Sequence, residues 1–406
     1  MSVYMGIDWS TKKHDIVLLN EAGAIIARQT IPHQAEGFEK LDKMRRELGV
    51  PIGECLIGME TAHNILIDFL WGQGYERVYV IPPSVVRSSR GRYGSSGARS
   101  DQRDARLLAD ILRTDCARLQ RWRPDSLLTQ QIRAKASLIH HLTQSVQRTR
   151  QRLRAILVRY YPGALGMFGS LTAQITLHFL RQYPNPQAMS QLSYGQFKDF
   201  ARAHGYQRRW WPRQYARMQE TYPVASETTV QVYQEEMELL AQQLLELVQT
   251  RLTQKRALTQ LFKQHPDQAI FASLPGAGEI LAPALLAKFG DDRERFPDPQ
   301  SVQALAGTCP VTAASGKRRV VKFRRACDKE FRHIAHQWAR ASLGKSVWAN
   351  AYWEQVRARV GYNNDAYRRL ANRWLAIAWR LWKSRQIYDE AYHLQQRAQR
   401  SKPQVR

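Results

Sequence analysis

The sequence contains little cysteine and no long apolar run. Its 406 residues include four cysteines, and no two of them form a CxxC pair: Cys55, Cys116, Cys309 and Cys327. This scarcity argues against a disulfide framework or a cysteine zinc site and suits a reducing cytosol. No apolar run approaches the roughly 18 residues that a membrane-spanning helix needs, and the N-terminus lacks a charged-then-apolar signal pattern. We therefore expect a folded cytoplasmic protein without a membrane partner.

Acidic residues are also few. The chain has 35 Asp and Glu against 61 Lys and Arg, which gives a formal net charge of +26. A folded protein this basic is usually matched to a polyanion, most often a nucleic acid. The alternative is a basic surface that serves only solubility. The positive charge is densest between residues 317 and 345, and we predict nucleic-acid contacts there for Lys317, Arg318, Arg319, Lys322, Arg324 and Arg325.

Residues 1–122 show the pattern of an α/β domain. Three strands are predicted in "VYMGIDWS" and "HDIVLLNEAGAIIARQTI", followed by a helix, the strand "ECLIGMET", a second helix and the strand "RVYVIPP". This order is that of an RNase H-like core, although many α/β domains begin in a similar way.

The rest of the chain is predicted to be mostly helical. Apolar residues keep heptad spacing from Leu128 to Tyr160 and again from Val230 to Leu247. Two heptad stretches of this length favour a coiled coil or bundle that joins subunits, and the alternative is a hairpin of two helices inside one chain. We place this helical region at 123–262 with a mixed insert at 161–225, a C-terminal domain at 263–392, and a disordered basic tail at 393–406.

The insert carries the stretch "YQRRWWPRQYAR", in which basic residues alternate with aromatic ones. Trp210, Trp211 and Tyr215 would suit stacking on nucleic-acid bases. They would equally suit the end of a helix that packs on its neighbour, and the sequence does not separate these two interpretations.

Four carboxylates have positions that suit a metal site. Asp8 ends the first predicted strand, Glu60 ends "ECLIGME", and Asp101 and Asp104 lie three apart on one face of a predicted helix. An RNase H-like sheet brings these elements around one cleft, where four carboxylates can hold two divalent ions that act on a phosphodiester. Hard oxygen ligands favour Mg²⁺ over zinc. For Asp101 alone, an acidic first turn of a capped helix is the simpler explanation.

Two motifs in the C-terminal third suit DNA chemistry. "LPGAGEILAPALLAKFG" predicts a hairpin between helices, in which Gly276 and Gly278 free backbone N–H groups for a DNA phosphate, or else a purely structural turn. Ser315 is predicted to lie in a loop and is followed closely by Lys317, Arg318 and Arg319. Such a serine could attack phosphorus, although a serine in a loop ordinarily has no catalytic role.

In this order, over roughly residues 3–385, the motifs resemble those of the DEDD transposases of the bacterial insertion-sequence family one hundred and ten. "GIDWSTKKHDI" is similar to that family's first-Asp motif, "METAHNIL" to its Glu motif, and "ARSDQRDARLLA" to its paired-Asp motif. "LPGAGEILAPALLAKFGD" and "LAGTCPVTAASGKRR" resemble the two halves of its C-terminal transposase domain.

The resemblance implies a RuvC-like N-terminal domain in which Asp8, Glu60, Asp101 and Asp104 hold Mg²⁺, and a nucleophilic serine that falls on Ser315. It further implies a coiled-coil region for oligomerisation, a tetramer, and a serine that becomes covalently joined to DNA. A structured noncoding bridge RNA would pair with donor and target double-stranded DNA and choose the sites. The enzyme would work in the bacterial cytoplasm, on the nucleoid.

The leading hypothesis is therefore an RNA-guided DNA recombinase with an α/β domain followed by mostly helical ones. Two alternatives belong to other classes. One is a metal-dependent nuclease, such as a junction resolvase, that uses only the four carboxylates. The other is an architectural protein that uses only its basic surface.

Overall fold

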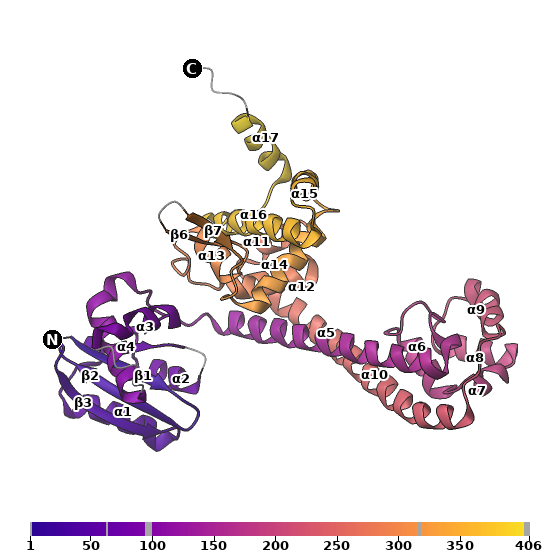
Figure 1. The fold of residues 1–406 in the computed structure, drawn as a ribbon, viewed down its shortest axis with the longest axis horizontal. Coiled ribbons are helices and arrows are strands. Elements are labelled where there is room, and N and C mark those ends of the chain that lie inside the picture. The colour runs from indigo at the N-terminus through magenta and orange to yellow at the C-terminus, as the bar shows by residue number, and fades with distance from the viewer. Residues whose placement is uncertain (1, 62–63, 94–99, 316–317, 402–406) are drawn as a thin grey trace. The chain divides into compact units, whose positions relative to one another are not determined.

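A computed structural model describes residues 2–61, 64–93, 100–315 and 318–401, and these form two compact units, Met1–Asp125 and Ser126–Arg406 (Figure 1). The division lies three residues beyond the boundary expected from sequence. The helical region and the C-terminal domain, expected to be separate, belong to one unit. No helix in the described ranges is both long and apolar enough to cross a membrane.

The first unit contains a mixed five-stranded sheet in the order β3-β2-β1-β4-β5, which confirms the predicted α/β class. The pairs β1–β2 and β2–β3 are antiparallel, whereas β1–β4 and β4–β5 are parallel. The strands are β1 (Val3–Trp9), β2 (Lys13–Leu19), β3 (Ile25–Pro32), β4 (Cys55–Met59) and β5 (Val78–Val80). The helices are α1 (Ala35–Glu47), α2 (Ile65–Gly72), α3 (Pro83–Ser89) and α4 (Asp101–Asp115), with short 3-10 turns at Ile52–Glu54, Arg90–Tyr93 and Cys116–Arg118.

Helices cover both faces of this sheet. Apolar residues of α1 and α2 pack on one face, and those of α4 pack on the other. Helix α4 lies directly on the backbone of β1 at Gly6, where an added Cβ would be 1.9 Å from the Ala105 carbonyl oxygen and 2.5 Å from the Ala109 nitrogen. Only glycine permits this approach. It brings the first turn of α4 to the end of β1 that carries Asp8.

The second unit contains a long helical hairpin of α5 (Leu127–Tyr160) and α10 (Glu227–Lys263). The helices are antiparallel, since Lys135 Nζ donates to Gln254 Oε1 at 2.6 Å and Arg152 Nε to Glu236 Oε1 at 2.7 Å. The predicted heptad positions form the seam, with most of them buried. The seam of α5 is therefore covered by α10 of the same chain, as in the intramolecular alternative, and the role of this region in joining subunits stays a prediction.

The insert forms four short helices at the end of this hairpin: α6 (Gln174–Gln182), α7 (Pro186–Ser190), α8 (Tyr194–Ala203) and α9 (Trp211–Met218), with 3-10 turns at Pro162–Ala164 and Arg208–Trp210. Trp211 is buried and donates through its indole N–H to the Tyr206 carbonyl, and the Tyr215 hydroxyl donates to that of Leu192. These two aromatics therefore pack in the protein. Trp210 is 40% exposed, with the Arg209 guanidinium over its ring.

The remainder of the second unit is mainly helical and is built around tryptophans. Its elements are α11 (Gln268–Ala272), α12 (Gly278–Phe289), α13 (Pro299–Leu305), β6 (Val311–Ser315), β7 (Arg318–Lys322), α14 (Lys329–Ser342), α15 (Val347–Val360), α16 (Asn363–Ser384) and α17 (Glu390–Ser401). Trp338, Trp374 and Trp382 are fully buried, and each indole N–H has an acceptor, respectively the Pro275 carbonyl, Ser342 Oγ and the Gly290 carbonyl. Large rings with a satisfied polar atom suit a core of this kind.

The tail departs from the prediction of disorder. Residues 393–401 continue helix α17, and residues 402–406 lie outside the described part of the chain. The Ser346 hydroxyl and the backbone N–H of Trp348 both donate to the Glu390 carboxylate at the start of α17. These contacts fix the first turn of α17, which composition alone did not predict.

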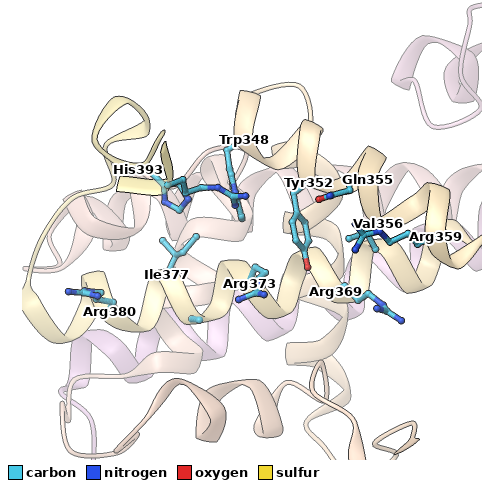
Figure 2. Close-up of a pocket in the computed structure, with 12 residues that line it drawn as sticks. Trp348, Tyr352, Gln355, Val356, Arg359, Arg369, Arg373, Ile377, Arg380 and His393 are labelled. Carbon is cyan, nitrogen blue, oxygen red and sulfur yellow. The ribbon is translucent and has the colours of Figure 1, made fainter. Parts of the chain in front are cut away.

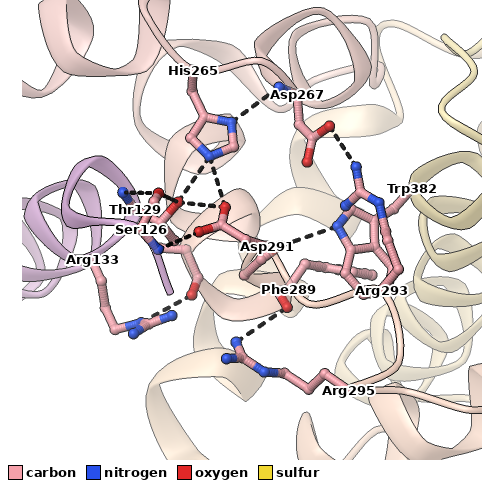
Figure 3. Close-up of polar contacts among 12 residues, drawn as sticks. Ser126, Thr129, Arg133, His265, Asp267, Phe289, Asp291, Arg293, Arg295 and Trp382 are labelled. Carbon is pink, nitrogen blue, oxygen red and sulfur yellow. Dashed lines mark hydrogen bonds and ion pairs between the residues drawn. The ribbon is translucent and has the colours of Figure 1, made fainter. Parts of the chain in front are cut away.

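A polar cluster fixes the start of α5 to the rest of its unit (Figure 3). Asp291 accepts from the Ser126 N–H at 2.6 Å, from the Thr129 hydroxyl at 2.7 Å and from His265 Nε2 at 3.1 Å. The Asp267 N–H donates to His265 Nδ1 at 3.0 Å, which places the ring proton on Nε2. Burial alone would raise the pKa of Asp291, but these donors hold that pKa below its usual range.

Candidate functional site

Asp8 and Glu60 lie at neighbouring strand ends. Strands β1 and β4 are parallel, and Ile7 pairs with Met59 in their register. Asp8 directly follows Ile7, and Glu60 directly follows Met59. Both residues therefore lie at the carboxyl edge of the sheet. Sequence order alone predicted this pairing, and the register explains it.

Asp101 and Asp104 lie in the first turn of α4, which Ser100 caps by accepting from the Arg103 N–H at 3.3 Å. Each aspartate has a basic partner in this conformation. Lys13 Nζ is 3.1 Å from Asp101 Oδ2, and Arg90 Nη2 is 3.2 Å from Asp104 Oδ2. The capped acidic turn proposed as the simple alternative is therefore real, but it does not account for the neighbouring carboxylates.

Three of the predicted carboxylates lie close enough to the fourth, Asp8, to act on its ionisation. The pKa of Asp8 is raised from 3.8 to about 6, first by burial and then by the negative charges of Asp104, Asp101, Glu60 and Asp15, in that order. Asp8 is thus at the centre of the cluster. Perturbed carboxylates of this kind gather at functional sites more often than elsewhere.

Asp15 is a fifth carboxylate that the sequence analysis missed. It faces Asp8 directly in the antiparallel register of β1 and β2, and it is 3% exposed. The Thr30 hydroxyl donates to Asp15 Oδ1 at 2.5 Å, and Lys13 Nζ is 3.6 Å from Asp15 Oδ2. Asp15 stands in the predicted strand "HDIVLL", but only the register of β1 and β2 shows that it lies opposite Asp8.

The cluster suits a hard divalent cation in its chemistry, since every donor is a carboxylate oxygen. In the described ranges, however, no three His, Cys, Asp or Glu side chains are grouped so that they could hold a metal ion. Lys13 and Arg90 instead supply the positive charge beside Asp101 and Asp104. A metal ion bound there would compete with these ion pairs for the carboxylates.

Ser315 is the last residue of β6, so the prediction that it lies in a loop is wrong. Strands β6 and β7 form an antiparallel hairpin, and Ser315 pairs with Arg318 at its tip. Residues 316–317, and therefore Lys317, lie outside the described residues, as do the side chains of Ser315, Arg318 and Arg319. The hairpin belongs to the second unit, whereas the carboxylates belong to the first.

The other predicted nucleic-acid contacts lie at the end of β7 and just after it. Lys322 and Arg325 are exposed. Arg324 is partly buried, because its Nε donates to the Cys309 carbonyl at 3.3 Å and its own carbonyl accepts from Arg332. Arg324 therefore holds the base of the hairpin, while the two exposed residues present their charge to solvent.

The two predicted hairpin glycines differ in their surroundings. Gly276 has φ +76°, and an added Cβ would lie 2.5 Å from backbone atoms of Ala341 in α14, so close packing explains this glycine. Gly278 has φ +55° and open space around it at the start of α12. The phosphate contact stays a prediction, and Glu279 beside it, paired with Lys255 at 2.7 Å, adds a negative charge there.

Comparison with known proteins shows that both candidate sites lie in regions matched by family models. A family model for DEDD transposases of the IS110 type, described as a transposase, matches residues 5–162 and includes all four carboxylates. A second, described as the transposase IS116/IS110/IS902 family, matches residues 268–354 and includes the serine hairpin.

Three relatives match along almost their whole length. The mini-circle putative transposase for IS117 of Streptomyces coelicolor is 29% identical over 96% of both chains. The uncharacterized 43.6 kDa protein of insertion element IS110, from the same species, is 21% identical over 96% of both. The uncharacterized 42 kDa protein of insertion element IS900 of Mycobacterium paratuberculosis is 24% identical over 96% of this chain and 98% of the relative. The two family models together span more than half of the sequence in the expected order, and the chain belongs to the IS110 family of transposases.

Proposed function

We propose that this transposase cuts and rejoins DNA at an insertion sequence through a serine-linked intermediate, with an Mg²⁺-binding DEDD site assisting. The observation that carries the proposal is the gathering of Glu60, Asp101 and Asp104 around Asp8, whose pKa is raised to about 6. The strand order and directions of the first unit support a RuvC-like, RNase H fold for it. The family's model covers this same region.

The four carboxylates would hold the metal, which would stabilise the charge that develops on phosphodiester oxygens. Asp8 is mostly ionised at neutral pH, since its pKa is about 6, and it is therefore ready to bind a cation. Asp15, held by Thr30, keeps a further negative charge beside Asp8. Lys13 and Arg90 neutralise Asp101 and Asp104 until a cation replaces them.

Ser315 is the proposed nucleophile. Its Oγ would attack a DNA phosphorus, forming an Oγ–P bond while the bond from phosphorus to one strand oxygen breaks. The serine proton is lost to solvent or a base, and the leaving oxygen gains a proton. A hydroxyl of another strand then attacks the phosphoserine, which rejoins DNA and restores the serine. The position of Ser315 at the tip of a hairpin rich in basic residues supports this role.

The proposal extends to partners. Double-stranded donor and target DNA would be selected by a structured bridge RNA through base pairing, and the protein would supply charge and chemistry. The net charge of +26 supports a polyanionic partner. The helix-hairpin-helix-like turn at Gly276 and Gly278 would contact a DNA phosphate. A tetramer, inferred from the family resemblance, would allow the acidic site of one protomer to work beside the serine hairpin of another.

The test is a recombination assay with donor plasmid, target plasmid and the RNA encoded beside the gene. Ser315→Ala should abolish both recombination and a covalent protein–DNA adduct seen by denaturing electrophoresis. Asp101→Asn should lower the rate at least about a thousandfold, since a lost metal ligand removes several kcal/mol of transition-state stabilisation. Asp199→Asn, an exposed carboxylate on α8 paired with Arg202, is the matched control.

The outcomes separate the competing functions. Recombination by Ser315→Ala would eliminate the serine mechanism. Cutting without rejoining by Ser315→Ala, lost in Asp101→Asn, would identify a nuclease that uses only the carboxylates. Unchanged activity of both variants would reduce the acidic cluster to a structural feature.

A further inference from the structure

Three hollows lie in a row along helix α16 in the second unit. The first, of about 720 Å³, lies between α15, α16 and α17 (Figure 2). The second, of about 570 Å³, shares Tyr352, Arg369 and Arg373 with it. The third shares Ile377, Arg380, His393 and Arg397 with the first. We call this continuous feature, from Arg368 to Arg385, the α16 groove, and its length is about 26 Å at 1.5 Å per residue.

Two helix faces form the walls of the α16 groove. On α16, Arg369, Arg373 and Arg380 are spaced at i, i+4 and i+11, and all three are exposed. On α15, Trp348, Tyr352 and Arg359 follow the same spacing. Among the described residues that line the first two hollows, none is Asp or Glu. The first two hollows are therefore a concentration of guanidinium groups, of which Arg369 is paired with Asp365 at 3.0 Å, and Asp389 lines the third hollow.

An aromatic pair lies in the wall beside these arginines. The rings of Trp348 and Tyr352 are stacked, with centroids 5.7 Å apart and an angle of 23° between their planes. Tyr352 is partly exposed and lines both of the first two hollows. Its ring offers a platform for another flat group. Arginines that follow a backbone beside an aromatic platform are typical of single-strand binding, because only an unpaired base exposes its face.

Trp348 supplies a second, independent observation. It is 4% exposed, and within the described chain its indole N–H meets no acceptor. The three core tryptophans of the same unit all have one. A buried donor without an acceptor is costly. Its place in the wall of the α16 groove is where a ligand rich in oxygen atoms would bind.

The second hollow leads toward the serine hairpin. It is lined by Val321 of β7 and by Pro310, immediately before β6. Val321 pairs with Thr312, and Ser315 is three residues further along β6, or about 10 Å at 3.3 Å per residue. A chain lying in the α16 groove would therefore extend toward the tip of this hairpin.

We propose that the α16 groove binds a single-stranded polynucleotide segment, with its phosphates on Arg369, Arg373 and Arg380 and a base on Tyr352. The inference rests on the proposed function only for what happens at Ser315. Binding itself follows from the groove. A strand held in the α16 groove would reach the serine hairpin unpaired. Such a strand could be DNA opened for strand exchange, or an unpaired part of an RNA that pairs with DNA elsewhere.

The first test measures binding in a Ser315→Ala background, so that strand cleavage plays no part. The triple variant Arg369→Gln/Arg373→Gln/Arg380→Gln is compared with Arg159→Gln/Arg181→Gln/Arg202→Gln, which removes the same charge from exposed positions elsewhere in the unit. Fluorescence anisotropy with short single-stranded DNA, single-stranded RNA and duplex DNA gives the affinities. We expect the groove variant to bind single strands at least about tenfold more weakly than the control, with a salt slope lower by about 2.

The arms identify the strand. A loss for DNA, for RNA or for both supports the groove and names its ligand. Groove and control variants that bind single strands equally would overturn the proposal. An equal loss for the duplex would overturn the single-strand assignment.

The second test probes the platform. Tyr352→Leu should weaken single-strand binding about fivefold or more, while Tyr352→Phe should bind as the parent does, since stacking needs only the ring. An oligonucleotide containing 5-iodouracil should crosslink to Tyr352 on irradiation. Crosslinks confined to other elements would contradict the groove. Because none of these measurements depends on Ser315, the groove can fail while serine chemistry stands, and the reverse.

Discussion

The two units gather charge of opposite sign in different ways. At the sheet edge of the first unit, four carboxylates lie close enough to Asp8 to raise its pKa, and Lys13 and Arg90 pair with two of them. In the α16 groove of the second unit, arginines line the walls beside aromatic rings. Like charges held together are unfavourable until a counter-ion arrives. The ligands proposed for the two sites differ accordingly, a small cation for the first and a polyanion for the second.

The largest effect is expected from a substitution that disrupts the acidic cluster of the first unit and leaves the α16 groove of the second unit intact. Gly6→Ala forces a Cβ into the α4 backbone, 1.9 Å from the Ala105 carbonyl oxygen, so α4 must move. We expect a loss of about 3 kcal/mol or more in the unfolding free energy of the first unit. Urea unfolding followed by circular dichroism measures it. Single-strand binding by the second unit should remain.

Gly72→Ala is the matched control. The position is in α2, and an added Cβ there has nothing within 4 Å. It should be neutral or slightly stabilising, because alanine favours helix. If Gly6→Ala is as mild as this control, the close approach of α4 does not position the acidic cluster.

The second prediction concerns the cost of the acidic cluster itself. Asp8 has a folded pKa of about 6 and an unfolded pKa of 3.8, so the folded state binds this proton more tightly. Without metal, its contribution to stability is therefore lost as pH rises from about 4 to about 6, by about 1–2 kcal/mol because solvent screens this half-buried group. Asp8→Asn lacks this loss and should be more stable than the parent at pH 7.5 in EDTA, with the difference shrinking toward pH 4.

Urea unfolding at both pH values measures this effect. Added Mg²⁺ should stabilise the parent more than Asp8→Asn, because only the parent keeps the full ligand set. A parent protein that exceeds Asp8→Asn in stability at pH 7.5 without metal would show that the carboxylates do not strain one another.

A smaller effect is expected at the start of α5. Thr129 is buried, and its hydroxyl lies 2.8 Å from His265 Nε2 and 2.7 Å from Asp291 Oδ1. Thr129→Val keeps the shape and removes the hydroxyl, which should cost about 1–3 kcal/mol by leaving polar groups short of a partner. Thr129→Ser should restore most of the loss. Equal melting temperatures of the Thr129→Val and Thr129→Ser variants would show that the hydroxyl does not contribute to stability.

The smallest effect is expected on the metal affinity of the acidic cluster, through the ion pair between Lys13 and Asp101. Lys13→Gln removes the ammonium that lies 3.1 Å from Asp101 Oδ2. A divalent ion would no longer compete with this exposed ion pair, which solvent screens and weakens. Affinity for Mn²⁺, measured by calorimetry, should therefore rise about two- to fivefold. Weaker binding of Mn²⁺ by Lys13→Gln would mean that Lys13 positions the carboxylates for the metal ion and does not compete with it.

Sequence reasoning succeeded where local pattern decides structure. Strand alternation and order predicted the α/β unit, and heptad spacing predicted the buried faces of α5 and α10. It failed where the partner is distant. Nothing in the heptads specified that α10 of the same chain covers the seam. Composition predicted a disordered tail, but contacts from Ser346 and Trp348 to Glu390 anchor α17.

The candidate site shows the same limit. Asp8, Glu60, Asp101 and Asp104 could be proposed from the sequence because each lies near the end of a strand or in the first turn of a helix. Asp15 required the register of β1 and β2. The α16 groove required the pairing of two helix faces, and the arginine spacing along α16 shows only one of them.

The contact at Gly6 has a consequence for how this protein tolerates mutation. Backbone touches backbone there, so the distance between the strand bearing Asp8 and the helix bearing Asp101 and Asp104 does not depend on any side chain. Substitutions that enlarge or shrink the surrounding core would shift packing without changing that distance. Two codons, those of Gly6 and Gly58, therefore guard the close approach of α4 to the sheet, and Gly6 leaves the less room of the two.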